Sequence, residues 1–298
     1  MNQLWRDKVN FTDLIIKIAN EAGFQVNLLE KDYYLTLILS KINELCPNLA
    51  FKGGTCLNKI HFDYHRLSED LDFTMILPQT KMTRKERFAL MKPVKEKMES
   101  FVKQFDMKVE NLNKAGHSES TMYNFQLTYD SVITNKEEII KLDISLIGTP
   151  VTLTEEKEIK HKFFNQFGER LINIGNVTTL SLKELIAEKM RAGATREKIA
   201  ARDFYDLDYA IRNKFDFKNK DFAAVFKKKL AQENFDADLN KYAINLGRKD
   251  EEIAEMKDKL QEELYPVLTI QERKIYNINK ALERINNVVK TLSEEAAS

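Results

Sequence analysis

Two adjacent glycines, Gly53 and Gly54, separate a short apolar run from a helical pattern. The run at 49–51 reads Leu-Ala-Phe and favours a strand, whereas residues 55–60 favour a helix. Glycines between a strand and a helix let backbone amides approach a ligand closely, and the helix N-terminus attracts an anion. Thr55 can cap this helix or donate its hydroxyl to a phosphate. A lone Gly-Gly-Thr is more often an ordinary turn, so a phosphate-binding interpretation needs support from the surrounding residues.

Periodicity along the rest of the chain predicts an α+β fold, in which helices flank a mixed sheet and an all-helical domain follows. Nine glycines and five prolines among 298 residues agree with a helix-rich chain. The polar segment 160–178 separates the two patterns, so we expect a domain with a helical N-terminal segment and a mixed sheet over 1–170 and a helical domain over 171–298. Helices are expected over 27–46 and 83–105, and from about Ser181 onward. Strands are expected over 49–51, 67–77, 107–109, 122–129 and 139–147.

The charges of the chain nearly balance, with 47 Lys and Arg against 46 Asp and Glu, a net charge of +1. This total excludes a strongly basic nucleic-acid binder but allows local patches. Six lysines between Lys214 and Lys229 could follow an RNA backbone or form an ordinary solvated surface. Two cysteines exclude a disulfide framework. Since no apolar run approaches the ~18 residues of a membrane span and no signal peptide opens the chain, we expect a cytoplasmic protein with no membrane partner, and a monomer.

Carboxylates mark the strand predicted after the glycine turn. Asp70 and Asp72 are two residues apart, so on a strand both side chains leave the same face. Adjacent carboxylates raise each other's pKa unless a cation lies between them, and Mg²⁺ combines such ligands with substrate phosphates. A third carboxylate, Asp143, lies in an apolar strand, where an unpaired buried charge costs several kcal/mol. We therefore expect Asp70, Asp72 and Asp143 to bind metal and to catalyse in-line attack on a nucleotide phosphate.

Further polar side chains are expected on the strand face that carries the two aspartates. Arg66 and Ser68 share the parity of the two aspartates, and Arg66 could contact a phosphate or simply neutralise the aspartate pair. Lys31 and Lys59 are interpreted as structural ion-pair partners. The predicted nucleotide-binding residues of this region are Gly53, Gly54, Thr55, Arg66 and Ser68.

Together these stretches resemble the core of the polymerase-β-like nucleotidyltransferase superfamily. More narrowly, they are similar to the AbiEii/AbiGii toxin family of type IV abortive-infection toxin–antitoxin systems. The spacing from Gly54 to Asp70 is longer than in the generic superfamily pattern and similar to the AbiEii-type pattern. The resemblance extends to a C-terminal motif over 182–207. It rests on Glu30-Lys31-Asp32-Tyr33-Tyr34, on Gly53-Gly54-Thr55 with Leu57 and Lys59, and on Arg66-x-Ser68-x-Asp70-Leu71-Asp72-Phe73.

The resemblance implies a nucleotidyltransferase toxin that uses Mg²⁺ (or Mn²⁺) to transfer NMP from an NTP to an RNA acceptor. The family suggests GTP as the nucleotide, the 3′ end of tRNA as the acceptor and growth arrest in phage defence as the result. A cognate antitoxin is expected to repress the operon and need not bind this chain. The resemblance also places Lys189, on a phosphate, and Asp203 in the active site. Asp206 is the alternative carboxylate, or it pairs with Arg202 or Lys198.

Two other functions stay open from the sequence. The chain could be a non-catalytic protein that binds nucleotide or RNA on the same fold. Three retained carboxylates and Lys189 argue against this, because a pure binder gains nothing from clustered negative charge. The chain could also modify a protein hydroxyl, in which case protein and not RNA would be labelled by the nucleotide.

Overall fold

The computed structural model describes residues 4–78, 82–243 and 245–297, so residues 1–3, 79–81, 244 and 298 of the two predicted domains lie outside it. The chain divides into two compact units. The first comprises Met1–Pro150 and Thr154–Leu180, and the second comprises Val151–Leu153 and Ser181–Ser298. The division after Leu180 lies downstream of the boundary that the sequence suggested at 170.

The first unit is built on a mixed sheet. Among the described residues the sheet has eight strands in the order β3-β5-β6-β2-β1-β8-β7, with β4 paired to β5. The central strands combine both orientations, because β2 runs antiparallel to β1 and parallel to β6. This arrangement confirms the predicted mixed sheet and α+β class. The strands are β1 Leu49–Lys52, β2 Leu71–Met75, β3 Lys108–Val109, β4 Gly116–His117, β5 Met122–Asp130, β6 Glu137–Ser145, β7 Glu155–Glu158 and β8 Asn176–Thr179.

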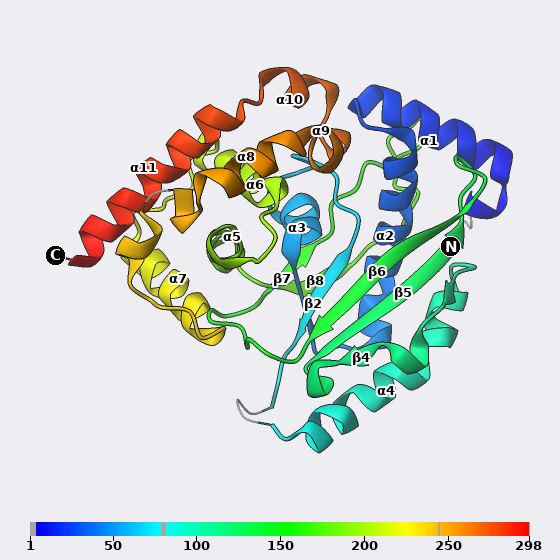
Figure 1. Ribbon diagram of the computed structural model, residues 1–298. Helices are drawn as coiled ribbons and strands as arrows, with labels where there is room; N and C mark the ends of the chain where they lie inside the picture. The colour runs from blue at the N-terminus through cyan, green and yellow to red at the C-terminus, as the bar shows by residue number, and fades with distance from the viewer. Residues whose placement is uncertain (1–3, 79–81, 244, 298) are drawn as a thin grey trace. The chain divides into compact units, whose positions relative to one another are not determined.

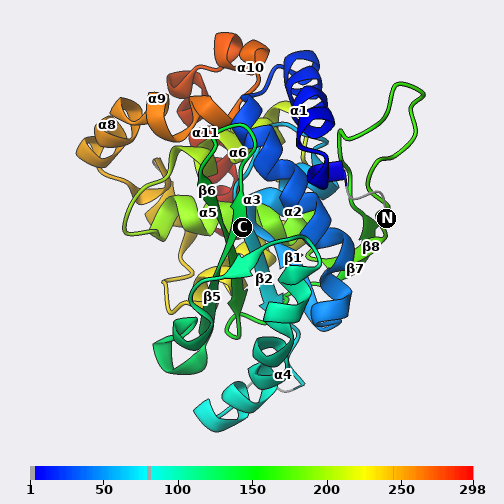
Figure 2. The ribbon, with the colours of Figure 1, turned by 90° about the vertical axis from the view of Figure 1, so that its right-hand side faces the viewer.

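Helices cover one face of this sheet (Figure 1). The α2 helix spans the sheet, because its Tyr34 ring lies 4.1 Å from the Tyr129 ring of β5 and its Asn43 amide donates to the Asn176 carbonyl of β8. The α1 helix lies beside α2 (Figures 1 and 2). Gly53 begins the short helix α3, which continues as a π-helical turn over Leu57–His61. The helices are α1 Lys8–Ala22, α2 Val26–Leu45, α3 Gly53–Cys56 and α4 Arg84–Lys103.

One expectation about a strand was wrong, and one strand was not predicted. The strand predicted over 67–77 is limited to Leu71–Met75, and the chain at 67–70 is irregular, so Asp70 precedes the strand. The polar segment 160–178 is not only a linker, because its end forms β8, which pairs in parallel with β1. Both β7 and β8 are four residues long. Such short strands carry too few residues for an alternating pattern to be read.

The second unit is helical throughout its described residues, as predicted (Figures 1 and 2). Ser181 caps α5, and the Glu184 carboxylate accepts the backbone N–H groups of Val151 and Thr152, both at 2.9 Å. These hydrogen bonds attach the short segment Val151–Leu153 to this unit. No helix in the described part of the chain is long and apolar enough to cross a membrane. The helices are α5 Leu182–Thr195, α6 Ala201–Arg212, α7 Lys220–Gln232, α8 Asp250–Asp258, α9 Leu260–Glu263, α10 Ile270–Ile275 and α11 Ile278–Ala297.

Candidate active site

A row of four polar side chains crosses the middle of the sheet. Asn124 of β5 pairs with Asp143 of β6, Asp143 pairs with Asp72 of β2, and Asp72 pairs with Lys52 of β1. Residues directly opposite each other on neighbouring strands project from the same face, with Cβ atoms about 5 Å apart. All four are half-buried. The structure therefore brings together Asp72 and Asp143, which lie far apart in the sequence.

The residues between these polar positions point the other way, into the core. Phe73, Leu142 and Phe125 alternate with Asp72, Asp143 and Asn124 along their strands, and each of the three apolar side chains is fully buried. The α2 helix covers this apolar face, since Tyr129 shares the parity of Phe125. The sheet thus has one apolar face and one that carries carboxylates.

Gly53 lies directly against the carboxylate of Asp72. Its φ of +77° is in the left-handed region, and a Cβ atom on Gly53 would overlap with Oδ2 of Asp72. Gly54 makes a similar approach to other side chains, because a Cβ atom there would lie 2.5 Å from Nη2 of Arg66 and 3.1 Å from Oγ of Ser68. Both glycines are therefore required by close contacts as well as by the turn. The turn and the predicted residues Arg66, Ser68 and Asp72 form one cluster.

Thr55 and Arg66 are held by the backbone that leads into β2. The buried Thr55 hydroxyl donates to the Asp70 carbonyl, which ties the start of α3 to the residue before β2. Nη1 of Arg66 donates to the Leu67 carbonyl at 2.8 Å, and the Arg66 side chain is only 1% exposed. In this structure the Thr55 hydroxyl therefore fixes the loop that bears Asp70.

Asp143 has an unusual electrostatic environment. Burial raises the pKa of its carboxyl group, and the negative charge of Asp70 raises that pKa further. A hydrogen bond from the Asn124 side-chain amide to Oδ1 of Asp143 acts in the opposite direction and stabilises the ionised form. A cation beside Asp143 would likewise favour ionisation, since it offsets both burial and the charge of Asp70.

The donor set fits a hard divalent cation that also binds substrate. Within residues 4–78, 82–243 and 245–297, no three His, Cys, Asp or Glu side chains converge closely enough to hold a metal ion by themselves. Mg²⁺, however, is usually held by one or two carboxylates, with water and substrate phosphates completing its shell. Asp72 and Asp143 offer two such carboxylates on adjoining strands, and Asp70 adds negative charge nearby.

In the second unit, Lys189 of α5 is held between two carboxylates of α6. Its Nζ lies 2.7 Å from Oδ1 of Asp203 and 2.9 Å from Oδ2 of Asp206. Arg196 contacts the other oxygen of Asp203 at 3.0 Å. The Asp203 and Asp206 side chains are 3% and 0% exposed, so both carboxylates are buried, whereas Arg196 remains exposed. The predicted lysine and both candidate aspartates thus form one group.

The sequence interpretation missed two residues of the row. Lys52 had a usable signal, because it immediately precedes Gly53 at the end of a predicted strand. Asn124 had only a weak signal, namely its position between the apolar residues Tyr123 and Phe125. Its contact with Asp143 depends on the pairing of β5 with β6, which the sequence does not state.

Lys31 and Lys59 form ion pairs, in agreement with their structural interpretation. Nζ of Lys59 lies 2.8 Å from Oδ1 of Asp32, and both side chains are fully buried. Lys31 contacts Glu69 at 3.3 Å in a more exposed position. The charged residues around Asp32 are therefore part of the core that supports the glycine turn.

Comparisons with known proteins identify the family and the fold of the chain. A family model described as nucleotidyl transferase AbiEii toxin, type IV TA system, matches residues 37–284, which include every candidate site residue. No curated protein matches the chain.

Solved structures show a similar fold. JHP933 from Helicobacter pylori has a TM-score of 0.52 at 16% identity, covering 92% of this chain and 95% of that chain. MenT4, a nucleotidyltransferase toxin from Mycobacterium tuberculosis, has a TM-score of 0.60 at 13% identity, covering 95% of this chain and 89% of that chain. At these identities the likeness concerns the fold alone. Because the family model spans most of the sequence, the chain belongs to the AbiEii family of nucleotidyltransferase toxins of type IV toxin–antitoxin systems.

Proposed function

We propose that this toxin transfers a nucleoside monophosphate from an NTP to an RNA acceptor, the 3′ end of tRNA, in the cytoplasm, and thereby arrests growth. The observation that carries the proposal is the pairing of Asp72 with Asp143 on adjoining strands, with the Asp72 carboxylate against Gly53. The proposed cofactor is Mg²⁺ or Mn²⁺, and the proposed nucleotide is GTP. The antitoxin of the system is proposed to act as an operon repressor that need not bind the toxin.

Each residue of the site has a proposed task. Asp70 and Asp72 hold the divalent cation, which when bound neutralises charge on the triphosphate. The turn at Gly53, Gly54 and Thr55 cradles the phosphates, and Arg66 and Ser68 support it. Asp143 completes the donor set or accepts the proton of the attacking hydroxyl. The hydroxyl oxygen of the acceptor bonds to the α-phosphorus, the bond from this phosphorus to the bridging oxygen breaks, and pyrophosphate leaves.

Lys189 is proposed to bind phosphate of the triphosphate, with Asp203 and Asp206 as positioning residues. A lysine ammonium has three donors and acts as a compact point charge on phosphate. Replacement by Met removes the charge, so we expect Lys189→Met to lower kcat/KM roughly 100-fold, as for other charge-stabilising groups. Loss of Asp206, by Asp206→Asn, should raise KM for the NTP while leaving part of kcat. Unchanged kinetics in Lys189→Met would remove Lys189 from the site.

The decisive experiment is label transfer from each of four α-³²P-labelled NTPs into total tRNA, with and without Mg²⁺. We expect metal-dependent labelling of RNA, strongest with GTP, that falls at least about 100-fold in Asp72→Asn. Asp130→Asn is the matched control, because Asp130 is an exposed carboxylate at the end of β5. Equal labelling by wild type and Asp72→Asn would refute the site. Label on protein and not on RNA would refute the RNA acceptor, and sequencing the RNA 3′ ends would identify it.

A further inference from the structure

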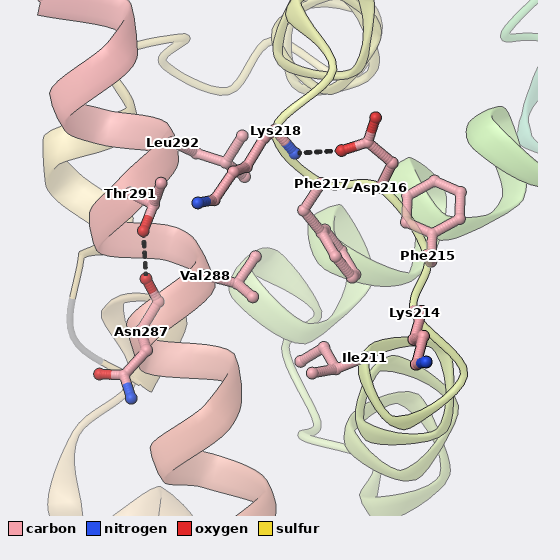
Figure 3. A pocket seen from close by; sticks show the side chains of 10 residues that line it. All are labelled: Ile211, Lys214, Phe215, Asp216, Phe217, Lys218, Asn287, Val288, Thr291 and Leu292. Carbon is pink, nitrogen blue, oxygen red and sulfur yellow. Dashed lines mark hydrogen bonds between the residues drawn. The ribbon is translucent and has the colours of Figure 1, made fainter.

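The second unit contains a pocket of about 490 Å³ that the proposed transfer reaction does not use. It lies between α11 and the loop that follows α6 (Figure 3). Phe217 and Val288 point into it from opposite sides, and Ile211 and Leu292 extend its apolar walls (Figure 3). Such a mainly apolar pocket with a few polar groups has the ordinary composition of a ligand site.

The loop beside the pocket alternates charged and aromatic residues, reading Lys-Phe-Asp-Phe-Lys over 214–218. The Phe215 and Phe217 rings lie 4.8 Å apart in an edge-to-face contact, which fixes their orientation. Lys214 and Lys218 are both exposed. The carboxylate between them, on Asp216, accepts the backbone N–H of Lys218 at 3.1 Å. The rim therefore carries two ammonium groups and one carboxylate that already has a hydrogen-bond donor.

The opposite rim is formed by α11. Asn287 of α11 is exposed, its backbone carbonyl accepts the Thr291 hydroxyl at 3.1 Å, and its side-chain amide points away from Val288 and Phe217 (Figure 3). The apolar wall with its aromatic ring and the two ammonium groups together match a base with its flanking phosphates.

The six lysines between Lys214 and Lys229 are not all exposed to solvent. Lys229 is buried and pairs with Glu184 at 2.6 Å and Glu188 at 2.9 Å. It therefore belongs to the core between α5 and α7 and cannot contact RNA. Lys214 and Lys218 remain as the exposed lysines that border an apolar pocket.

We propose that this pocket binds an unpaired nucleotide of the acceptor RNA, with the base between Phe217 and Val288 and the phosphates at Lys214 and Lys218. The inference rests on the proposed function, because RNA is the acceptor named there. An uncharged apolar molecule or apolar peptide would use the walls but would leave the two ammonium groups without a matching charge, so charge complementarity favours RNA.

The first test measures binding of a fluorescein-labelled single-stranded RNA decamer by anisotropy at several salt concentrations. The variant Lys214→Gln/Lys218→Gln should bind more weakly, and its slope of log K against log salt should fall by about 1.4, since each contact to single-stranded phosphate contributes about 0.7. Lys227→Gln/Lys228→Gln on α7 is the control with the same charge change. If the slope falls equally in both variants, the lysines contribute only general electrostatic attraction to RNA. This result would overturn the proposal.

The second test fills the pocket without changing charge. Val288 is half-buried on α11, and Val288→Trp places a large ring between the two walls. We expect RNA binding to weaken roughly 5- to 100-fold, the usual effect of losing one base stack, while circular dichroism and thermal unfolding stay unchanged. If RNA binding is unchanged but the fluorescence of an apolar dye in the pocket is lost, the pocket serves another ligand and the proposal fails.

Photocrosslinking separates this inference from the proposed function. A decamer that contains 4-thiouridine should crosslink within residues 211–218 or 287–292, and crosslinks only elsewhere would overturn the pocket assignment. Crosslinks at the pocket without label transfer to any RNA would refute the transfer reaction but retain an RNA-binding pocket. Label transfer that persists at wild-type KM for RNA in both pocket variants would refute the pocket and retain the reaction.

Discussion

Gly53 and Gly168 have nearly the same backbone conformation, with φ of +77° and +78°, but very different surroundings. A Cβ atom on Gly53 would overlap with the Asp72 carboxylate, whereas one on Gly168 would meet no atom within 4 Å. Substitutions at Gly53 and Gly168 can therefore separate the energetic cost of a left-handed backbone from the effect of displacing the Asp72 carboxylate. At the scale of single residues, we therefore expect the glycine turn to affect the proposed transfer through the position of Asp72.

Alanine substitution of these two glycines tests this view. Both Gly53→Ala and Gly168→Ala should lower the free energy of unfolding by about 1–2 kcal/mol, because an L-residue adopts the left-handed region at that cost. Gly53→Ala alone should also reduce label transfer, by about 100-fold, since a displacement near 1 Å of a reacting group has such an effect. Urea unfolding and the transfer assay measure the two quantities. Similar activity of the two variants would contradict the contact with Asp72.

Asn124 is expected to support catalysis through Asp143. Asn124→Ala removes the donor to Oδ1 of Asp143, so the carboxylate loses the hydrogen bond that orients it and favours its ionised form. Loss of a residue that hydrogen-bonds to a metal ligand typically lowers metal affinity or activity by about 10- to 100-fold. The Mg²⁺ concentration for half-maximal label transfer should therefore rise by about that factor. Gln126→Ala, two residues along the same face of β5, should leave it unchanged. Parallel changes in both variants would indicate general damage to β5.

At the scale of elements, one buried ion pair fixes the helical segment after the glycine turn onto α2. Lys59 in the π-helical turn contacts Asp32 of α2 at 2.8 Å, and its ammonium also donates to Thr36 Oγ1 at 2.8 Å and to Tyr64 Oη at 2.9 Å. Burial lowers the pKa of Lys59, and the negative charge of Asp32 offsets only part of this decrease. Removing Lys59 alone is therefore costly, because the Asp32 carboxylate would stay buried without its partner.

Lys59→Met is expected to lower the free energy of unfolding by about 3–5 kcal/mol, the usual cost of removing one member of a buried pair. Lys31→Met is the control, because the Lys31–Glu69 pair is more exposed and should contribute about 1 kcal/mol or less. The double variant Asp32→Asn/Lys59→Met should recover part of the loss, since it leaves no unpaired charge. Urea denaturation measures all three. A small effect of Lys59→Met would mean that Asp32 finds another partner or becomes protonated at little cost.

The elements that could be predicted from the sequence are those whose pattern is long. Apolar periodicity located α2 and α4 within two residues of their bounds, and it placed the start of the helical region at about Ser181, next to the start of α5. β8 was not predicted, because its Asn-Val-Thr-Thr sequence becomes a strand only through pairing with β1. Alternation placed Asp70 and Asp72 on one face of a strand, but only Asp72 lies in β2, and its position beside Asp143 depends on the parallel pairing of β2 with β6. The position of Asn124 beside Asp143 follows from the antiparallel pairing of β5 with β6 and was not predictable.

At the scale of the whole molecule, the charges nearly cancel at pH 7, so net repulsion contributes little to stability near neutral pH. His161, one of two buried histidines in the described part of the first unit, is expected to have a larger effect in acid. His161 is 6% exposed, its Nδ1 accepts the Phe163 N–H at 3.0 Å, and its Nε2 is buried without a hydrogen-bond partner among the described residues. Its ring stacks on Phe164 with centroids 4.9 Å apart. Burial, together with the charges of Lys59 and Arg170, lowers the pKa of His161 to about 4.

This low pKa predicts a loss of stability in acid. An unfolded histidine has a pKa of about 6.5, so between pH 6.5 and 4 the unfolded chain binds a proton that the folded chain does not. Stability should therefore fall as the pH falls through this window, by about 2 kcal/mol between pH 7 and pH 5. Trp5 is the single tryptophan and lies buried in the first unit, so its fluorescence reports unfolding of that unit. His161→Gln, which keeps an acceptor but does not titrate, should lose about 2 kcal/mol less than wild type over the same pH range. Parallel pH profiles of the two proteins would show that His161 is protonated in the folded state and that another group governs acid unfolding.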